Sequence, residues 1–473
     1  MAVRVSIDTD TWWHLAAGKR IVESGEIIRE DPFSLTRQGQ SWIYPGWLSQ
    51  VILFQFYDLW GYQGLILLTA LFVVLAFACI WPLLEGPPLM RAGTILLAAS
   101  VSAVYWSARP QIMSFTLSGA FLLILMKVRE GNHRLALILP FIMALWTNLH
   151  GGFAIGFIFI VAFLVGEIME AASEIIRDGA AMKSAWLEHR RILLIWVVVG
   201  LACAVAVVFN PHGAEMLRYP FKTISIGALQ DYIQEWQSPN FHNLEAQPFL
   251  WMLLLILASL ALSKKEVTWV SLLLVLGFAY MGFVAARNIA IFALVAAPLL
   301  CKHGYAAVKP FLKHRKPDKQ VPEQIARVLN LVILALMVIA TGLKITLPLD
   351  KEFIQQAIAE NSPVEAVNAI REEGLYGNLF NSYNWGGYVI WALYPDSLSF
   401  VDGRTDLFND EILEDYISAW RADPAWEEIL NDWEIKVALL ETGSPLAKVL
   451  NLTGWNEVYQ DEMAVVLTNE KVP

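Results

Sequence analysis

The chain has 473 residues, of which 56% are hydrophobic and only 16% are charged, whereas ordinary globular chains are about a quarter charged. A soluble fold could not bury this much apolar surface, so the composition predicts an α-helical polytopic membrane protein. The net charge of −10 argues against nucleic acid as a partner. The three cysteines lie in apolar runs without metal-ligand spacing, which is typical of small buried residues.

The first segment, residues 1–60, precedes any apolar run that could cross a bilayer. Its stretch SIDTDTWWHL contains Asp8 and Asp10, and the pattern predicts a helix over residues 11–25. Residues 47–61 are apolar but short, and the aromatic side chains at their ends predict a position along the membrane surface.

Ten apolar runs, each long enough to form most of a membrane span, follow this segment. They predict ten crossings in a bundle over residues 61–347. The runs are 61–84, 92–107, 110–128, 134–149, 151–172, 191–209, 248–262, 267–285, 288–302 and 326–346.

Basic residues are concentrated in loops 127–134, 173–191, 264–265 and 302–325, all on one side of such a bundle. The positive-inside rule makes that side cytoplasmic, so we expect a multi-pass protein of the cell (inner) membrane with both the first segment and the tail outside. Seven residues before Asp8 cannot cross a bilayer. Either a further span is expected upstream, or insertion of the first span carries the N-terminus across.

The tail, residues 348–473, differs in composition from the rest. From residue 350 onward it has 23 acidic and 7 basic residues, a net charge of −16, so the rest of the chain is +6. Short β-rich runs (GNLFNSY, LSFVDG, IKVALLE, MAVVLT) alternate with helical stretches (PVEAVNAIREEG, GGYVIWALY, EILEDYISAW). This alternation predicts a small extracytoplasmic α/β domain.

Polar side chains are costly in a membrane protein unless they line a cavity or serve a site. Those on the predicted outer side are Asp8, Asp10, His14, Arg109, Asn148, His150, Asn210, His212, Glu235, Arg287 and Asn288. Arg109 and Arg287 run against the positive-inside bias, so a lipid phosphate is a natural partner for them.

Structural alternatives remain open for several of these residues. Asn148 could bridge helices, and the sequences NPHG and SARP could simply form turns that stop helices. His150 could be a satisfied interfacial histidine, and Arg287 could extend to bulk headgroups.

The aspartate pair has three possible roles. One carboxylate could be a general base that takes a proton from an acceptor hydroxyl. The D-x-D pair of Asp8 and Asp10 could instead hold a divalent cation, Mg or Mn, against a phosphate. The third role is structural, with Asp10 as the N-cap of the following helix.

The stretch DTDTWWHLAAGKRIVESGEIIREDPFSLTRQGQSW resembles the first outer loop of bacterial GT-C membrane glycosyltransferases, which include protein O-mannosyltransferases and aminoarabinose transferases. NLHGGF, EWQSPNF, RNIAIFALVAAP and NWGGYVIWALYPDSLSFVDGRTDLF are similar to an uncharacterised subgroup of these membrane proteins. Two positions depart from the family pattern: Ile28 stands where a proline is usual, and Gly46 where a glutamate is expected.

The resemblance implies a GT-C bundle that moves a sugar from a polyprenyl-phosphate donor to an acceptor glycan, lipid or protein. It implies a catalytic base at Asp8 or Asp10, and a first span upstream of this loop. Arg109, Arg287 and His150 are the candidates for holding the leaving phosphate. Two other functions remain open, a lipid or glycan transporter (flippase) and a catalytically inactive membrane scaffold.

The stretch VDGRTD ends a predicted strand of the tail, which is a common place for a site in α/β sheets. Asp402 and Arg404 are therefore candidates for substrate binding. The structural alternative is a turn in which Asp402 and Arg404 pair with each other.

Overall fold

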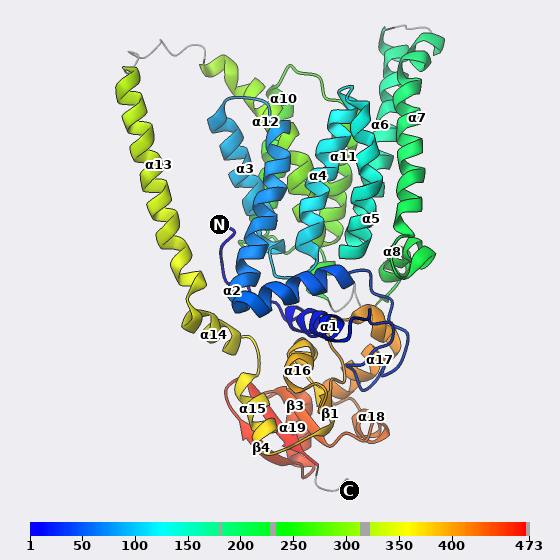
Figure 1. The fold of residues 1–473 in the computed structure, drawn as a ribbon, viewed down its shortest axis with the longest axis vertical. Helices are drawn as coiled ribbons and strands as arrows, with labels where there is room; N and C mark the ends of the chain where they lie inside the picture. Colours follow the sequence, from blue (N-terminus) through cyan, green and yellow to red (C-terminus); the bar gives the residue numbers. More distant parts are fainter. Residues whose placement is uncertain (179–181, 228–232, 313–321, 470–473) are drawn as a thin grey trace.

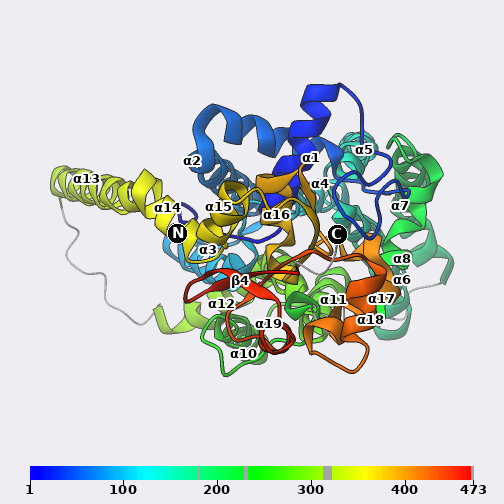
Figure 2. The same ribbon diagram turned by 90° about the horizontal axis from the view of Figure 1, so that it is seen from below.

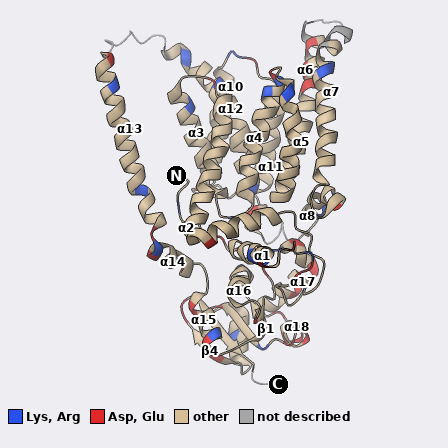
Figure 3. Ribbon diagram, viewed as in Figure 1, with Lys and Arg blue, Asp and Glu red and all other residues tan. Residues whose placement is uncertain are grey.

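In the computed structural model, which describes residues 1–469 apart from 179–181, 228–232 and 313–321, a helical bundle is joined to a small C-terminal domain (Figure 1). Parts of two basic loops, at 179–181 and 313–321, lie outside the described residues. Many of the described Lys and Arg residues of the bundle lie at its end far from the C-terminal domain (Figure 3).

Seven helices in the described part of the chain are long and apolar enough to cross a membrane, by length and composition. They are built on α2 (Trp47–Ile80), α3 (Pro88–Ser102), α4 (Gln111–Arg129), α6 (Ala154–Asp178), α7 (Met182–Val207), α12 (Ile289–Leu312) and α13 (Glu323–Thr346). Three shorter apolar helices are α5 (Leu139–Leu149), α10 (Gln247–Leu262) and α11 (Trp269–Val284). All ten predicted runs form helices, which confirms the polytopic helical class, although three are shorter than a full span.

Helix α2 bends sharply at Gly61, whose φ of 61° and ψ of −153° are not helical. Residues 47–60 lie across the base of the bundle, and the rest of α2 rises through it (Figure 1). The two arms approach closely, because a Cβ at Gly64 would lie 2.2 Å from the carbonyl oxygen of Phe56. This bend gives residues 47–60 the direction expected of a helix that lies along a membrane surface.

Helix α13 stands apart from the other long helices in both views (Figures 1 and 2). None of its most apolar stretch is buried against the rest of the chain. Because its side chains there are mainly leucine, isoleucine and valine, lipid is the solvent that suits its surface. It connects the bundle to the C-terminal domain.

The C-terminal domain is built on a five-stranded mixed sheet with strand order β2-β1-β3-β5-β4. β1 runs parallel to β2 and β3, whereas β5 is antiparallel to β3 and β4. The strands are β1 (Gly377–Asn381), β2 (Ser397–Leu398), β3 (Val437–Glu441), β4 (Asn456–Gln460) and β5 (Ala464–Thr468). The helices are α14 (Lys351–Ala359), α15 (Val364–Glu372), α16 (Gly386–Leu393), α17 (Thr405–Trp420), α18 (Trp426–Asp432) and α19 (Pro445–Leu452). This confirms the α/β domain, and β4 is an additional strand that the sequence pattern did not predict.

The first segment lies between the bundle and the C-terminal domain. Its helix α1 (Thr11–Ser24) is sandwiched between α2 and α16 (Figure 1). Farther along, the backbone N–H of Leu35 donates to the carbonyl oxygen of Ser399 at 2.8 Å, and the N–H of Ser399 donates to that of Phe33 at 3.1 Å. The first segment therefore joins the edge of the C-terminal domain through backbone hydrogen bonds.

A fully buried ion cluster strengthens this junction. Arg404 binds Asp402 through Nε at 2.8 Å and Nη2 at 2.7 Å, and its Nη1 donates to Asp31 of the first segment. All three side chains are closed to solvent, and the guanidinium carbon lies 4.9 Å from the ring centre of Trp42. Buried charges are tolerated only when they are paired and hydrogen-bonded, so this cluster fixes one relative position of the two segments.

Replacing Arg404 by alanine should destabilise the protein strongly. Two buried carboxylates would lose their counter-charge, which typically costs about 3–5 kcal/mol. Thermal unfolding of the purified protein, with limited proteolysis of residues 26–46, measures the effect. Arg327→Ala is the matched control, because Arg327 pairs with Glu323 on the exposed surface of α13 and such pairs contribute little. Equal stability of the two variants would contradict a structural role for the Arg404 cluster.

Candidate active site

A cavity of about 960 Å³ lies where the bundle, the first segment and the C-terminal domain meet. We call it the Asp10 cavity. Eight predicted site residues line it: Asp8, Asp10, His14, Arg109, His150, Glu235, Arg287 and Asn288. They come from segments far apart in the chain, and the fold brings them to one place.

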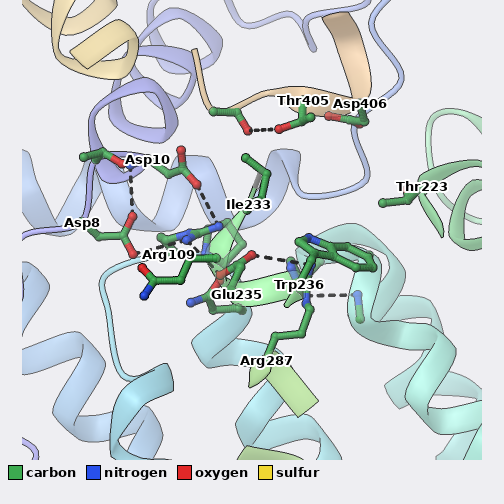
Figure 4. Close-up of a pocket in the computed structure, with 18 of the residues that line it drawn as sticks. Asp8, Asp10, Arg109, Thr223, Ile233, Glu235, Trp236, Arg287, Thr405 and Asp406 are labelled. Atoms are coloured by element: carbon green, nitrogen blue, oxygen red, sulfur yellow. Dashed lines mark hydrogen bonds and ion pairs between the residues drawn. The ribbon is translucent and has the colours of Figure 1, made fainter. Parts of the chain in front are cut away.

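Arg109 is at the centre of the charged groups in this cavity (Figure 4). Its Nη2 lies 2.8 Å from Oδ2 of Asp10, and its Nη1 lies 3.4 Å from Oδ2 of Asp8 and 3.5 Å from Oε2 of Glu235. Arg109 immediately precedes Pro110, the N-cap of α4, so the start of a long helix holds its backbone. One guanidinium thus holds three carboxylates from two other segments.

Glu235 connects Arg109 to the second arginine. Its Oε1 lies 3.6 Å from Nη1 of Arg287, and the guanidinium of Arg287 lies 4.4 Å from the ring centre of Trp236. Among the described residues, Glu235 is the one carboxylate paired with Arg287, and the 3.6 Å distance is long, so further N–H groups of this guanidinium can meet another anion. Stacking on Trp236 fixes its plane.

Asp10 precedes α1, but its side chain makes no capping hydrogen bond. Instead, Oδ1 of Asp8 accepts from the backbone N–H of Asp10 at 3.1 Å. The carboxyl of Asp10 faces the cavity and Arg109 (Figure 4). The capping alternative for Asp10 is therefore wrong, and Asp8 has a local structural role beside its contact with Arg109.

The surroundings shift the pKa values of Asp10 and Glu235 in opposite directions. Burial raises the pKa of Asp10 to about 7, with smaller contributions from Asp8 and Glu235, although Arg109 opposes the shift. Burial alone would raise the pKa of Glu235, but the positive charges of Arg109 and Arg287 outweigh burial and hold this pKa below its ordinary value. One carboxyl can therefore exchange a proton near neutral pH while its neighbour stays ionised, as acid–base sites require.

Glycines of the C-terminal domain allow it to pack directly on the aspartate segment. A Cβ at Gly403 would lie 1.7 Å from Oδ1 of Asp10, and a Cβ at Gly387 would lie 2.5 Å from the carbonyl oxygen of Thr9. The GGY and DGR sequences thus form the surface that buries Asp10.

His150 is held as a neutral hydrogen-bond donor. The backbone N–H of Gly152 donates to its Nδ1 at 3.0 Å. Trp146 donates from Nε1 to Oγ of Ser114 at 2.6 Å, which leaves the Ser114 hydroxyl to donate to the same Nδ1 at 2.8 Å. We assign the ring proton to Nε2 on this network. Burial, with Arg287 and Arg109, lowers the pKa of His150 to about 3.

His14 and Asn288 line the cavity, and each makes a polar contact with a neighbouring residue. Nδ1 of His14 lies 3.5 Å from Nε2 of Gln50, and burial keeps the pKa of His14 well below its ordinary value. Nδ2 of Asn288 donates to the carbonyl oxygen of Met281 at 3.1 Å. Both residues shape the wall rather than carry charge.

Five other candidates do not line the cavity: Asn148, Asn210, His212, Asp402 and Arg404. Oδ1 of Asn148 accepts from Nε1 of Trp47 at 2.8 Å, so Asn148 bridges helices α5 and α2. Nδ2 of Asn210 donates to the carbonyl oxygen of Thr147 at 2.9 Å, and its Oδ1 accepts from the N–H of His212 in a turn. Asp402 and Arg404 belong to the buried cluster described above. These contacts are those of the structural alternatives, and a substrate-binding role for Asn148, His212, Asp402 and Arg404 stays a prediction.

Sequence reasoning missed several residues that line the cavity. The hydroxyl of Tyr219 donates to Oδ2 of Asp406 at 3.1 Å, and burial raises the pKa of Asp406. Trp236 and Trp420 contribute aromatic side chains. Asp406 and Trp236 lay within quoted motifs, DGRTDLF and EWQSPNF, but nothing in the sequence singles them out.

The glutamate that the family pattern expects at position 46 would not fit here. A Cβ at Gly46 would lie 2.7 Å from Cε1 of Tyr44 and 3.0 Å from the carbonyl oxygen of Leu149.

Replacing Gly403 by alanine should force the C-terminal domain away from Asp10. Its methyl group would overlap the carboxylate, and overpacking of this kind typically costs about 1–3 kcal/mol. Thermal unfolding measures the loss. Gly277→Ala is the matched control, because a Cβ there meets no atom within 4 Å. If the two variants unfold at the same temperature, the close contact between Gly403 and Asp10 does not exist.

No protein-family model matches the chain, and no curated protein matches its sequence. Among solved structures, the oligosaccharyltransferase of Archaeoglobus fulgidus in the apo form is similar with a TM-score of 0.49 at 12% identity, covering 93% of this chain and 66% of that chain. ArnT from Cupriavidus metallidurans bound to undecaprenyl phosphate has a TM-score of 0.49 at 14% identity, covering 99% of this chain and 95% of that one. This chain thus spans about two thirds of the archaeal enzyme's length. At these identities and TM-scores, the similarity identifies neither the family nor the activity of the chain.

Proposed function

We propose that the protein is a glycosyltransferase that moves a sugar from a polyprenyl-phosphate donor to an acceptor on the extracytoplasmic face of the membrane. The observation that carries this proposal is the position of Asp10, whose carboxyl is 15% exposed and faces Arg109 in a cavity that also contains Arg287 and His150, and whose pKa is raised to about 7 by burial. The resemblance of the first segment and of the GGY and DGRTDLF stretches to GT-C glycosyltransferases supports the same reaction class.

The distribution of charge supports the orientation. Apart from those that line the cavity or belong to the first segment and the C-terminal domain, many Lys and Arg residues gather at the end of the bundle opposite the Asp10 cavity (Figure 3), and the positive-inside rule assigns that end to the cytoplasm. The cavity then opens outside the cytoplasm, where a lipid carrier can present the sugar at headgroup depth. Ile158 of α6 and Ile291 of α12 line the cavity on the bundle side and suit the first units of a lipid chain.

The reaction follows from the roles of the side chains. Ionised Asp10 takes the proton of the acceptor hydroxyl as the hydroxyl oxygen attacks the anomeric carbon of the sugar. The bond between that carbon and the phosphate oxygen breaks, and its electron pair leaves with the polyprenyl phosphate. Arg287 and the Nε2–H of His150 donate hydrogen bonds to the phosphate as its charge grows. Attack on the side opposite the leaving group inverts the anomeric configuration.

Transfer should depend on pH through Asp10. A base must be ionised, so we expect kcat/KM to rise about tenfold per pH unit at low pH and to level off above about pH 7. Asp10→Asn should lower the rate by on the order of 10²–10⁴-fold without loss of folded protein. Transfer of a labelled sugar from a polyprenyl-phosphate donor by the protein in nanodiscs measures both.

Asp396→Asn is the matched control, because Asp396 is exposed in the C-terminal domain and does not line the cavity. Full activity of the Asp10 variant would remove Asp10 from the chemistry. Movement of intact lipid-linked sugar between leaflets, without bond cleavage, would instead indicate a flippase.

Arg287→Lys should weaken donor use, because lysine cannot form the planar two-point contact that a guanidinium makes with phosphate. If Arg287 binds the leaving group, turnover should fall about tenfold or more, together with apparent donor affinity. Steady-state kinetics against donor concentration separate the two effects. Arg91→Lys, at the far end of the bundle, is the control. Normal turnover in Arg287→Lys would favour a non-specific contact with headgroups.

A further inference from the structure

The D-x-D pair and Glu235 surround a side-chain cation. We propose that the guanidinium of Arg109 supplies the positive charge that a divalent metal supplies in other D-x-D sites, and that this protein works without a metal ion. The part of this inference that concerns catalysis rests on the proposed function, whereas the part that concerns metal binding does not.

The contacts of Arg109 fill the position that a cation would take. Its two terminal nitrogens reach Asp10 at 2.8 Å, Asp8 at 3.4 Å and Glu235 at 3.5 Å. A divalent ion needs several oxygens at about 2.0–2.6 Å and usually takes more than one carboxylate. Here one oxygen of each carboxylate already faces the guanidinium. A metal could collect these oxygens only by displacing Arg109.

Displacing Arg109 would be difficult because its position is fixed at both ends. Its backbone N–H donates to the carbonyl oxygen of Ser107 at 2.8 Å, and its own carbonyl accepts from the N–H of Ile112 at 3.1 Å in the first turn of α4. Its side chain is only 19% exposed. A guanidinium keeps its charge at every physiological pH, so a metal beside it would meet a permanent repulsion.

The set of possible ligands points the same way. Within the described part of the chain, no group of three or more His, Cys, Asp or Glu side chains is placed to hold a metal. The three carboxyls that face this space, those of Asp8, Asp10 and Glu235, already contact the positive charge of Arg109.

This arrangement divides the work between the two arginines. Arg109 is committed to three carboxylates and acts as a positioning residue, which orients Asp10 and opposes the rise of its pKa. Arg287 has one long contact with Glu235 and remains able to meet a phosphate. We therefore assign phosphate binding to Arg287 and His150 rather than to Arg109.

The first test measures metal binding directly. The full-length protein in nanodiscs is titrated with Mn²⁺ and followed by electron paramagnetic resonance, beside an Asp8→Asn, Asp10→Asn double variant. We expect the two titrations to coincide. A Mn²⁺ site in the wild type that the double variant lacks, with a dissociation constant below about 1 mM, the weak limit of carboxylate cation sites, would overturn the proposal.

The second test measures transfer. Activity should stay within twofold after treatment with EDTA, and a loss of more than tenfold that Mg²⁺ or Mn²⁺ restores would overturn the proposal. In Arg109→Ala, added methylguanidinium should restore activity and raise the thermal unfolding temperature, whereas Mg²⁺ should do neither. Rescue by Mg²⁺ would contradict the assignment of Arg109 as the cation.

The metal-binding test and the transfer test can be interpreted independently of each other. If Arg109→Ala does not fold, the Mn²⁺ titration of the wild type still decides the question. If no sugar transfer is found under any condition, the proposed function fails, but the Mn²⁺ result remains valid for the site.

Discussion

The site depends on the contact between one guanidinium and three carboxylates. Asp8 and Asp10 come from the first segment, Glu235 from the loop before α10, and Arg109 from the start of α4. Without Arg109, three carboxyl groups would lie close together in a largely buried space without this counter-charge, which is costly for any of them that is ionised. The pairing lets the fold place a carboxyl with a pKa of about 7 beside a second one that stays ionised. The chemistry proposed for the cavity uses Asp10 as its base.

The C-terminal domain completes the site by excluding water from it. Gly403 and Gly387 pack against the aspartate segment so closely that no side chain would fit, and the buried Arg404 cluster holds the first segment to the same domain. Burial is the largest cause of the raised pKa of Asp10. A domain outside the bundle therefore sets the acidity of a group at the bundle's end, through packing rather than through direct contact with substrate.

The sequence predicted the helices of the bundle well. A long apolar run in a bilayer has to form a helix, because a helix satisfies its own backbone hydrogen bonds. It did not predict β4, since NEVYQ is mostly polar and lies exposed at the sheet edge without an alternating pattern. For the site, topology placed Asp8, Asp10, Arg109, Glu235 and Arg287 on one face, and the cavity contains them. Topology could not separate these from Asn148, Asn210 or His212. Their hydrogen-bond partners include Trp47 and Thr147, on other parts of the chain, and only the folded structure brings these groups together.

The most direct test of the account is a structure of the full-length protein in nanodiscs with polyprenyl phosphate. We expect a phosphate in the Asp10 cavity, within hydrogen-bond distance of Arg287 and Nε2 of His150, with Arg109 still bound to its carboxylates and the lipid chain leaving past Ile158 and Ile291. A phosphate bound outside the cavity, or a metal ion between Asp8 and Asp10 in place of Arg109, would contradict it.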